Sequence, residues 1–250
     1  MANKFFQFKQ FKIDQAFSGM KVTTDACLFG AWVAQRIESR AKEPSTILDI
    51  GGGTGLLSLM LAQKTRHTEI HSVEIDEGAF VELTFNFKNS KWSDRLNSHH
   101  SPFQKFHPQG VFDVIVSNPP FFDSSLKGSS SAKNLALHTE MLDQKTLLHR
   151  IPELLSPSGL IYVLYPEREM HQFAQNAKLK SLYPVEWVVV RNRHESEVFR
   201  IMACFQLLNS ATTTKNEVII KNSDQKYTDE FWSLLSDYYL EYNNPSQKSE

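Results

Sequence analysis

Cysteine is scarce in this sequence, and the scarcity excludes two ways of holding a protein together. Only Cys27 and Cys204 occur in 250 residues, too few and too isolated for a disulfide framework or a zinc site. We expect both to be buried, reduced thiols. The nine histidines do not stand in a metal-ligand spacing, and the pair His99 and His100 fits the end of a strand better than a ligand set. The sequence therefore predicts no metal.

Long apolar runs are also missing. No run approaches the roughly 20 residues that cross a bilayer, so we expect no membrane partner. The first thirty residues lack the continuous apolar stretch and the cleavage site of a secretory signal. We therefore expect the protein in the cytoplasm.

The chain lacks a large excess of charge of either sign. The formal net charge is −1, which argues against a protein that coats nucleic acid by bulk attraction, because such binders are usually strongly basic. Any nucleic-acid binding must therefore be local. Residues 1 to 21 hold four lysines against one aspartate, whereas six acids and two lysines follow from Asp224 onward. The C-terminal end is thus a poor candidate for a surface that faces phosphates.

Short apolar runs recur from residue 46 onward, separated by longer segments in the rhythm of β-α units. The runs are TILDI (46 to 50), EIHSVEI (69 to 75), RLNSHH (95 to 100), FDVIVSN (112 to 118) and GLIYVLY (159 to 165). Their continuous apolar character indicates a parallel sheet covered by helices on both faces. Two further runs, PVEWVVV (184 to 190) and VFRIMACF (198 to 205), are joined by a short polar link that suits an antiparallel pair. The predicted fold is an α/β, doubly wound, mostly parallel seven-stranded sheet with an antiparallel C-terminal strand pair.

The chain is expected to form one structural domain with an N-terminal extension. Residues 1 to 45 form an arm and a cap helix, the helix spanning residues 25 to 40. Residues 46 to 242 form the main α/β unit and end in an aromatic-rich helix over residues 227 to 242. Residues 243 to 250 are expected to fray.

A glycine-rich turn, LDIGGGTG (48 to 55), connects the first strand to an apolar helix. Glycine lets a ligand touch bare backbone, and the N-terminus of the helix offers unpaired N–H groups. Alone, such a turn is often only a tight connection. The spacing does not fit the dinucleotide fingerprint G-x-G-x-x-G, whose last position requires glycine or alanine. If the pattern begins at Gly51, its last position is Leu56, and if it begins at Gly53, its last position is Ser58. A ligand without a pyrophosphate fits better.

An acid at the end of the second strand supports a nucleoside ligand. The run VEID (73 to 76) puts Glu74 23 positions after Gly51, near the distance at which an acid receives ribose hydroxyls in such folds. Glu74 is otherwise an ordinary strand-end charge. Asp76 is expected to be the N-cap of the next helix rather than a ligand.

The turn SNPPFF (117 to 122) follows the fourth strand, at the edge where open parallel sheets bind their ligands. Two successive prolines cannot continue a strand, so they hold Asn118 in an extended conformation. The Asn118 side-chain oxygen and the Pro119 carbonyl can then both accept from an NH2 group, and Phe121 can stack on the ring that carries it. We predict Asn118, Pro119, Pro120 and Phe121 as the catalytic residues. The alternative is a loop that merely closes a strand.

Together, the GxGxG loop and the NPPF turn resemble the amino-methyltransferase class of the Rossmann-like methyltransferases. In that class the turn serves exocyclic nitrogens of adenine or guanine, and also glutamine amides. The resemblance implies S-adenosylmethionine as the cofactor. Because a sulfonium methyl group is already activated, alignment and exclusion of water supply most of the rate, and no strong base is required.

The segment FQFKQFKIDQAFSGMKVTTDACLFGAW (6 to 32) resembles the opening of the bacterial tRNA1(Val) (adenine-37-N6)-methyltransferases. The matching residues are Phe8, Lys9, Gln10, Phe11, Met20, Lys21, Val22, Thr24, Asp25, Leu28, Gly30, Ala31 and Trp32. The match continues through the glycine loop and the NPPF turn, roughly the first half of the chain, and beyond residue 140 only generic fold similarity remains. Thr23 and Ala26 stand where glycines are expected.

This resemblance implies methyl transfer to N6 of an adenine in tRNA, adenine 37 of tRNA1(Val), with the anticodon arm as the partner. The implied cofactor-binding residues are Lys21, Thr24, Asp49, Gly51, Gly53, Glu74, Ile75, Ser101, Pro102, Phe103 and Asn118. Many relatives carry an aspartate after the third strand, and here Ser101 and the local backbone take its place. Lys21, Thr24 and Asp25 would cover the methionine end of the cofactor, or alternatively cap a helix with Lys21 solvated.

Basic residues that can contact RNA occur in three segments. In the arm, Lys4, Lys9 and Lys12 alternate with four phenylalanines, a pattern that can hold phosphates and stack bases, although such aromatics more often pack on the domain. Weaker candidates are Arg191, Arg193 and His194 in the link after residue 190, and Lys127 and Lys133 after the NPPF turn. The stretch 123 to 134 that holds these two lysines is expected to be a mobile loop.

Three alternatives share part of this pattern. A guanine-N2 methyltransferase of ribosomal RNA has the same turn. A protein glutamine-N5 methyltransferase also orients an amide with it, but such enzymes usually carry a helical recognition domain, for which the 45 residues before the first strand leave no room. The third is a binding module that kept the fold without catalysis.

Overall fold

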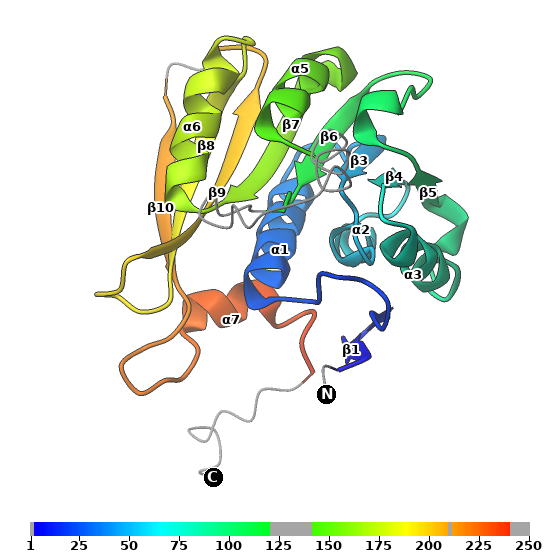
Figure 1. The fold of residues 1–250 in the computed structure, drawn as a ribbon. Helices are drawn as coiled ribbons and strands as arrows, with labels where there is room; N and C mark the ends of the chain where they lie inside the picture. Colours follow the sequence, from blue (N-terminus) through cyan, green and yellow to red (C-terminus); the bar gives the residue numbers. More distant parts are fainter. Residues whose placement is uncertain (1–2, 121–141, 210–211, 241–250) are drawn as a thin grey trace, which may run out of the picture.

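An open mixed sheet with helices on both faces forms the centre of the molecule (Figure 1). It is seen in a computed structural model that describes residues 3–120, 142–209 and 212–240. The strand order is β10-β8-β9-β7-β6-β3-β4-β5. The strands are β3 (Thr46–Ile50), β4 (Glu69–Glu74), β5 (Leu96–His100), β6 (Phe112–Ser117), β7 (Leu155–Tyr165), β8 (Tyr183–Arg191), β9 (Val198–Gln206) and β10 (Thr214–Ile219).

The sheet confirms the predicted fold class and extends it by one strand. Neighbours from β5 to β7 run parallel, and β9 lies antiparallel between β7 and β8, as predicted for the C-terminal pair. The eighth strand, β10, pairs in parallel with β8 at the edge. Its sequence, TKNEVI, is mostly exposed and lacks an apolar period, so the prediction of seven strands missed it.

Two hydrophobic layers show that the sheet is covered on both faces. One layer joins it to helices α1 (Thr24–Glu38), α2 (Leu56–Lys64), α3 (Glu77–Lys88) and α7 (Asp229–Leu235). The other joins it to α5 (Gln144–Leu154) and α6 (Glu167–Lys178), together with the short 3-10 helix η2 (Phe103–Lys105). A further 3-10 helix, η1 (Ser93–Arg95), precedes β5.

The last helix is shorter than predicted. Of the expected span of 227 to 242, the structure describes residues up to 240, and in these the helix covers Asp229–Leu235, where the Thr228 side chain caps the first turn. The chain then turns, because Tyr238 is buried and its hydroxyl donates to the carbonyl of Met60 at 3.1 Å, which holds it against α2. The tail predicted to fray, 243 to 250, lies outside the described residues.

The N-terminal arm is a hairpin packed on the domain. Its strands, β1 (Phe5–Gln7) and β2 (Lys12–Asp14), pair antiparallel, and Phe8 and Phe11 are buried with their rings stacked at 4.5 Å. The arm is tied to α3, since the backbone N–H of Asp14 donates to Asn86 Oδ1 at 2.9 Å. Phe8 and Phe11 therefore pack on the domain, which was one of the two predicted roles of the arm phenylalanines, the other being to stack on bases.

Candidate active site

The ends of four parallel strands meet at one edge of the sheet and form the site. Because β5, β4, β3 and β6 are neighbours in that order, the residues that follow them lie side by side. The glycine loop is folded onto β4, with the N–H groups of Gly51 and Gly52 donating to the carbonyl of Val73 at 2.9 and 3.1 Å. Gly51, Gly53 and Gly55 all have positive φ angles, of 74°, 55° and 87°.

Glu74 organises the adjoining strand end. Its Oε1 accepts from the N–H groups of Ile75 and Asp76, both at 2.8 Å, and its Oε2 accepts from the N–H of Gly53 at 2.8 Å. The next side chain, Ile75, is 39% exposed although it is large and apolar. Asp76 is the N-cap of α3, as predicted, and accepts from the N–H of Ala79 at 2.8 Å. An exposed apolar residue beside a strand-end acid suits a flat ring attached to a polyhydroxy group.

Asp49 lies beneath the loop rather than in the crevice. It is fully buried, and Ser58 Oγ donates to its Oδ2 at 2.8 Å. No partner within the described residues reaches Oδ1. Burial raises the pKa of this carboxyl from 3.8 to about 7, while the hydrogen bonds from Ser58 oppose the shift and the charge of Glu74 adds to it.

The three residues after β5 differ in their surroundings. Ser101 and Pro102 are half-buried beside Glu74, and the N–H of Ser101 donates to the Glu74 carbonyl at 3.1 Å. Phe103 is only 5% exposed and belongs to the hydrophobic layer under η2. Ser101 Oγ donates to the carbonyl of Pro102 at 3.0 Å. Ser101 and Pro102 therefore lie where a ligand near Glu74 can touch them, whereas Phe103 supports them from the core.

The residues expected at the methionine end are split between two places. The Lys21 ammonium donates to the carbonyls of Gln15 and Ser18, so it holds the preceding loop, while its side chain also lines the crevice beside the glycines. Thr24 begins α1 and lines the larger groove described below. Asp25 accepts from Arg200 Nε at 2.9 Å instead of capping the helix.

A crevice of about 50 Å³ joins the glycine loop to Asn118. It is lined by Met20, Lys21, Val22, Ala26, Gly51, Gly52, Gly53, Thr54, Leu56, Leu57 and Asn118. The crevice therefore combines bare backbone, apolar side chains and one amide. These residues fit the methionine end of a nucleoside-type ligand, with Glu74 and Ile75 nearby for the nucleoside end.

Asn118 lies at the end of β6, next to the strand that precedes the glycine loop. The register pairs Ile50 with Ser117, and Ser117 Oγ donates to the carbonyl of Ile50 at 2.9 Å, so the turn is tied to the strand that precedes the glycines. Asn118 Oδ1 is inaccessible to solvent and has no hydrogen-bond partner among the described residues. A buried acceptor without a donor is costly, so a donor from a ligand is the natural way to satisfy it.

The two prolines line a second cavity, which Asn118 does not line. Pro119 and Pro120 line a hollow of about 370 Å³ together with residues of α5 and α6. Phe121, predicted to stack on the substrate ring, lies outside the described residues, as does the stretch 123 to 134 with Lys127 and Lys133.

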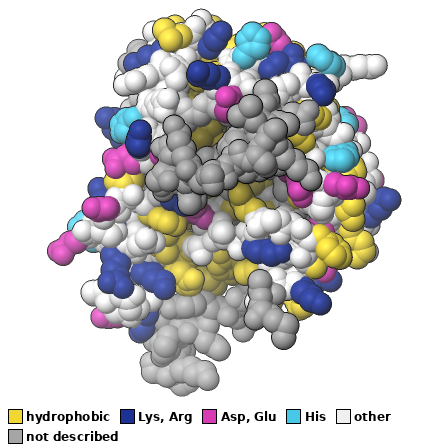
Figure 2. All heavy atoms as spheres, viewed as in Figure 1, with side chains coloured by type: hydrophobic (Ala, Val, Ile, Leu, Met, Phe, Trp, Pro, Cys, Tyr) yellow, Lys and Arg dark blue, Asp and Glu magenta, His cyan; other side chains and the backbone are white. Residues whose placement is uncertain are grey.

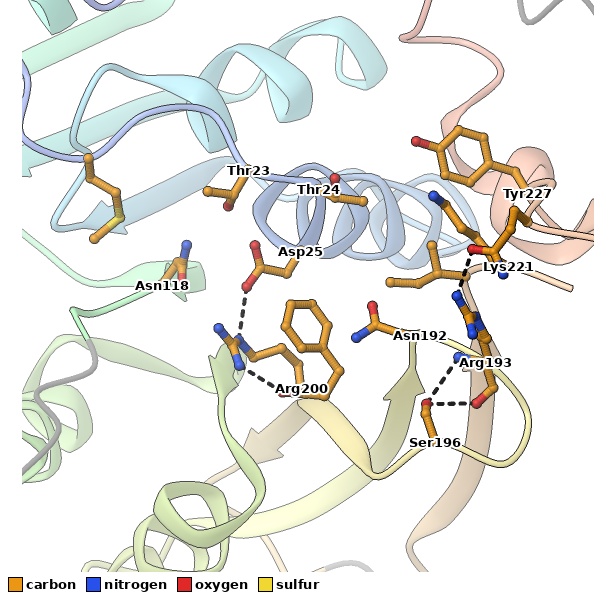
Figure 3. Close-up of a pocket in the computed structure, with 14 residues that line it drawn as sticks. Thr23, Thr24, Asp25, Asn118, Asn192, Arg193, Ser196, Arg200, Lys221 and Tyr227 are labelled. Atoms are coloured by element: carbon orange, nitrogen blue, oxygen red, sulfur yellow. Dashed lines mark hydrogen bonds and ion pairs between the residues drawn. The ribbon is translucent and has the colours of Figure 1, made fainter. Parts of the chain in front are cut away.

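A larger groove of about 780 Å³ begins at Asn118 and was not predicted as a unit (Figure 3). Its walls come from the N-terminus of α1, from the β8–β9 hairpin and from the link between β10 and α7. The cationic side chains in the lining are Arg193, Arg200 and Lys221, and the rings are Phe199 and Tyr227. Of these, only Arg193 was among the sequence candidates; Lys221 and Tyr227 gave no sequence signal.

Over the rest of the visible face, basic and acidic side chains are interspersed (Figure 2). This agrees with a net charge of −1 and with local rather than bulk attraction for a charged partner. In residues 3–120, 142–209 and 212–240, no three His, Cys, Asp or Glu side chains cluster as a metal site would require. None of the helices in the same part of the chain has the length and apolar character needed to span a membrane.

Sequence comparison identifies relatives over nearly the whole chain. Residues 17–163 match the methyltransferase small domain family. The tRNA1(Val) (adenine(37)-N6)-methyltransferase of Flavobacterium psychrophilum is 37% identical over 237 residues, which cover 94% of this chain and 99% of that protein. A protein of the same name from Trichodesmium erythraeum is 37% identical, and the match covers 97% of this chain and 100% of that protein. Another from Vibrio cholerae is 32% identical, and the match covers 96% of this chain and 97% of that protein. The similarity thus extends well past residue 140, where the sequence motifs alone had ended.

Solved structures confirm the fold. A predicted O-methyltransferase from Agrobacterium tumefaciens aligns with a TM-score of 0.61 at 13% identity, covering 88% of this chain and 99% of its own. A class I S-adenosylmethionine-dependent methyltransferase from Listeria monocytogenes aligns with a TM-score of 0.57 at 14% identity, covering 87% of this chain and 71% of its own. At such low identity the likeness establishes the architecture alone.

Proposed function

The chain belongs to the tRNA1(Val) (adenine(37)-N6)-methyltransferase family, and from this premise we propose that it transfers the methyl group of S-adenosylmethionine to N6 of an adenine in tRNA, adenine 37 of tRNA1(Val). The partner is then the anticodon arm of the tRNA, met in the cytoplasm. The proposal involves no metal.

The observation that carries the proposal is the unpartnered, buried Asn118 Oδ1 at the wall of the glycine crevice. An adenine amine offers the N–H group that this oxygen lacks. The carbonyl of Pro119 is the second acceptor we assign to that amine. Two acceptors in the plane of the base would leave the nitrogen lone pair directed out of that plane, toward the crevice.

Glu74 is assigned to the ribose of the cofactor. Its carboxylate accepts three backbone N–H groups, and two carboxylate oxygens offer about four acceptor sites, so one remains for a hydroxyl. Ile75 is assigned to one face of the cofactor adenine, because it is 39% exposed and adjacent to Glu74. Gly51, Gly53, Ser101 and Pro102 complete the contacts, mainly through backbone.

When bound, S-adenosylmethionine supplies a methyl group activated by the sulfonium. The chain's own residues then have to align the amine and exclude water, and neither task needs a strong base. The acid nearest to Asn118 in the groove is Asp25, which is paired with Arg200 at 2.9 Å. As the bond from N6 to the methyl carbon forms, the bond from that carbon to sulfur would break and leave a neutral thioether, and the surplus proton on N6 would then leave to water.

The test is a methyl-transfer assay with purified protein, labelled cofactor and total tRNA that lacks this modification, with N6-methyladenosine identified after nuclease digestion. Asn118→Ala should reduce transfer by a factor of about 10² or more and weaken cofactor binding by no more than about tenfold, the contribution of one neutral hydrogen bond. Label confined to guanine N2 of ribosomal RNA, or to glutamine in protein, would contradict the substrate. Cofactor binding without transfer to any of these would indicate a binding module.

A further inference from the structure

Two cationic side chains from distant parts of the chain are brought together at the far end of the groove. Strand β10 lies beside β8, and beyond its last residue the N–H of Lys221 donates to the carbonyl of Asn192 at 3.0 Å. Arg193 follows immediately. The β8–β9 hairpin and the β10–α7 link therefore form one continuous wall, with Asn118 at one end of the groove and Arg193, Lys221 and Tyr227 at the other (Figure 3).

No carboxylate of the described residues forms an ion pair with Arg193 or Lys221. Arg193 Nη2 donates to the neutral Gln225 Oε1 at 2.7 Å, and Lys221 Nζ lies 5.6 Å from the centre of the Tyr227 ring. Neither forms an ion pair within the described part of the chain, whereas nearby Arg200 is paired with Asp25.

The surrounding acids do not offset these charges inside the groove. Asp25 is the one acid among the lining residues of the described chain, and Arg200 occupies its carboxylate. Glu195, Glu197 and Asp224 belong to the same two links but do not line the groove. The charged side chains that line this end of the groove, Arg193 and Lys221, are thus both cationic, on a protein whose net charge is −1.

The lysines of the N-terminal arm are less available. Lys9 Nζ donates to the carbonyl of Ser236 at 2.8 Å, and Lys12 Nζ pairs with Asp14 at 2.8 Å. The phenylalanines Phe8 and Phe11 beside them are buried. Lys9 and Lys12 therefore hold parts of the fold together, and Lys4 is the exposed lysine of the arm that the RNA-binding test below has to include.

We infer that the groove binds the RNA strand that flanks the methylated adenine, with Arg193 and Lys221 contacting its phosphates. The inference rests on the proposed function and extends it by naming the surface. A volume of about 780 Å³ is within the range of pockets that enclose sizeable ligands. With the target base at Asn118, adjacent nucleotides would continue toward Lys221, where unpaired cations complement phosphate charge.

The test compares the double variant R193Q/K221Q with K4Q/K12Q, which removes the same amount of charge from the arm. Binding of a fluorescent anticodon stem-loop RNA is measured by anisotropy at several salt concentrations, and methyl transfer and cofactor affinity are measured in parallel. We expect R193Q/K221Q to weaken RNA binding at least tenfold, to lower the slope of log K against log salt by about 2, and to leave cofactor affinity unchanged. K4Q/K12Q should change RNA binding less than threefold.

The outcomes separate the surface from the function. Suppose that the unmodified protein methylates tRNA and that R193Q/K221Q binds RNA as tightly as the unmodified protein. The groove is then not the RNA site, although the proposed function stands. If K4Q/K12Q weakens RNA binding more than R193Q/K221Q does, the arm rather than the groove binds the RNA, and the inference is wrong. If the unmodified protein neither binds nor methylates tRNA, both proposals fail. Thermal melting of each variant identifies losses of binding that are caused by unfolding. If the double variant is unfolded, the single variants R193Q and K221Q test the inference instead, and each is expected to weaken RNA binding about threefold or more.

Discussion

Glu74 accepts a hydrogen bond from the backbone N–H of Gly53, with 2.8 Å between Oε2 and the nitrogen. The bond joins the end of β4 to the glycine loop after β3, so one carboxylate sets the shape of the loop and, in our proposal, also binds the ribose. Both tasks require two oxygen acceptors. An amide in the same place offers one acceptor and turns its NH2 group toward backbone N–H donors.

The variant Glu74→Gln should therefore weaken cofactor binding by a factor of about 10 to 100, in the range of one or two charged hydrogen bonds. Calorimetric titration with S-adenosylmethionine measures the change. The matched control is Glu77→Gln, an exposed acid in the first turn of α3, which should bind as the unmodified protein does. Equal affinities for the Glu74 and Glu77 variants would show that Glu74 does not contact the cofactor.

Two glycines of the loop should respond differently to alanine. At Gly53, with φ of 55°, a Cβ atom would find no atom of the described residues within 4 Å, so it would project into open space. At Gly55, with φ of 87°, it would come within 2.8 Å of Phe87 Cε1 and 2.9 Å of Leu83 Cδ1. The first change strains the backbone alone, whereas the second also overpacks the contact with α3.

Gly53→Ala should lower the free energy of unfolding by about 1 kcal/mol and cofactor affinity at least tenfold. Gly55→Ala should lower the free energy of unfolding by about 2 to 4 kcal/mol, from backbone strain plus overpacking. Urea denaturation without cofactor and titration with it distinguish the two. Should Gly53→Ala bind normally, the space in front of Gly53 is not part of the cofactor site.

The glycine loop, Glu74 and Asn118 could be placed together from the sequence because each lies at the end of a recognisable buried strand or directly after it. Parallel strands end at one edge, so strand order alone brings these residues close. The groove could not be placed in this way. Its far wall depends on the pairing of β10 with β8. The sequence of β10 is mostly polar and has no hydrophobic period, so it does not predict this pairing. The role of the arm was also open, since burial of Phe8 and Phe11 depends on a partner surface that the local pattern does not contain.

The two cysteines should be unreactive in the folded protein. Cys27 and Cys204 are free and buried, and burial raises the pKa of each thiol to about 12. At pH 8 the thiolate that attacks disulfide reagents is then nearly absent. A colorimetric thiol titration should find no reactive thiol in buffer and two after denaturation in urea. A reactive thiol in the folded state would mean that one of these sites opens to solvent.

Asp49 should give the stability of the protein a specific dependence on pH. Burial raises the pKa of this carboxyl to about 7 in the folded protein, from 3.8. Between these values the folded chain keeps a proton that the unfolded chain has released, so the free energy of unfolding falls as pH rises through the window, by about 1.36 kcal/mol for each pH unit. Below the window both forms are protonated, and above it both are ionised, so this contribution becomes constant.

Asp49→Asn removes the titration while keeping the size of the side chain. The free energy of unfolding of this variant, minus that of the unmodified protein, should therefore increase by about 2 to 3 kcal/mol between pH 5 and pH 8, as measured by urea denaturation without cofactor. Exposed Asp224, changed to Asn, controls for the effect of the substitution itself. Parallel stability curves for the Asp49 variant and the unmodified protein would mean that the buried carboxyl does not hold its proton near neutral pH. In that case the negative charge beneath the glycine loop would have to be stabilised by more than the hydrogen bonds from Ser58.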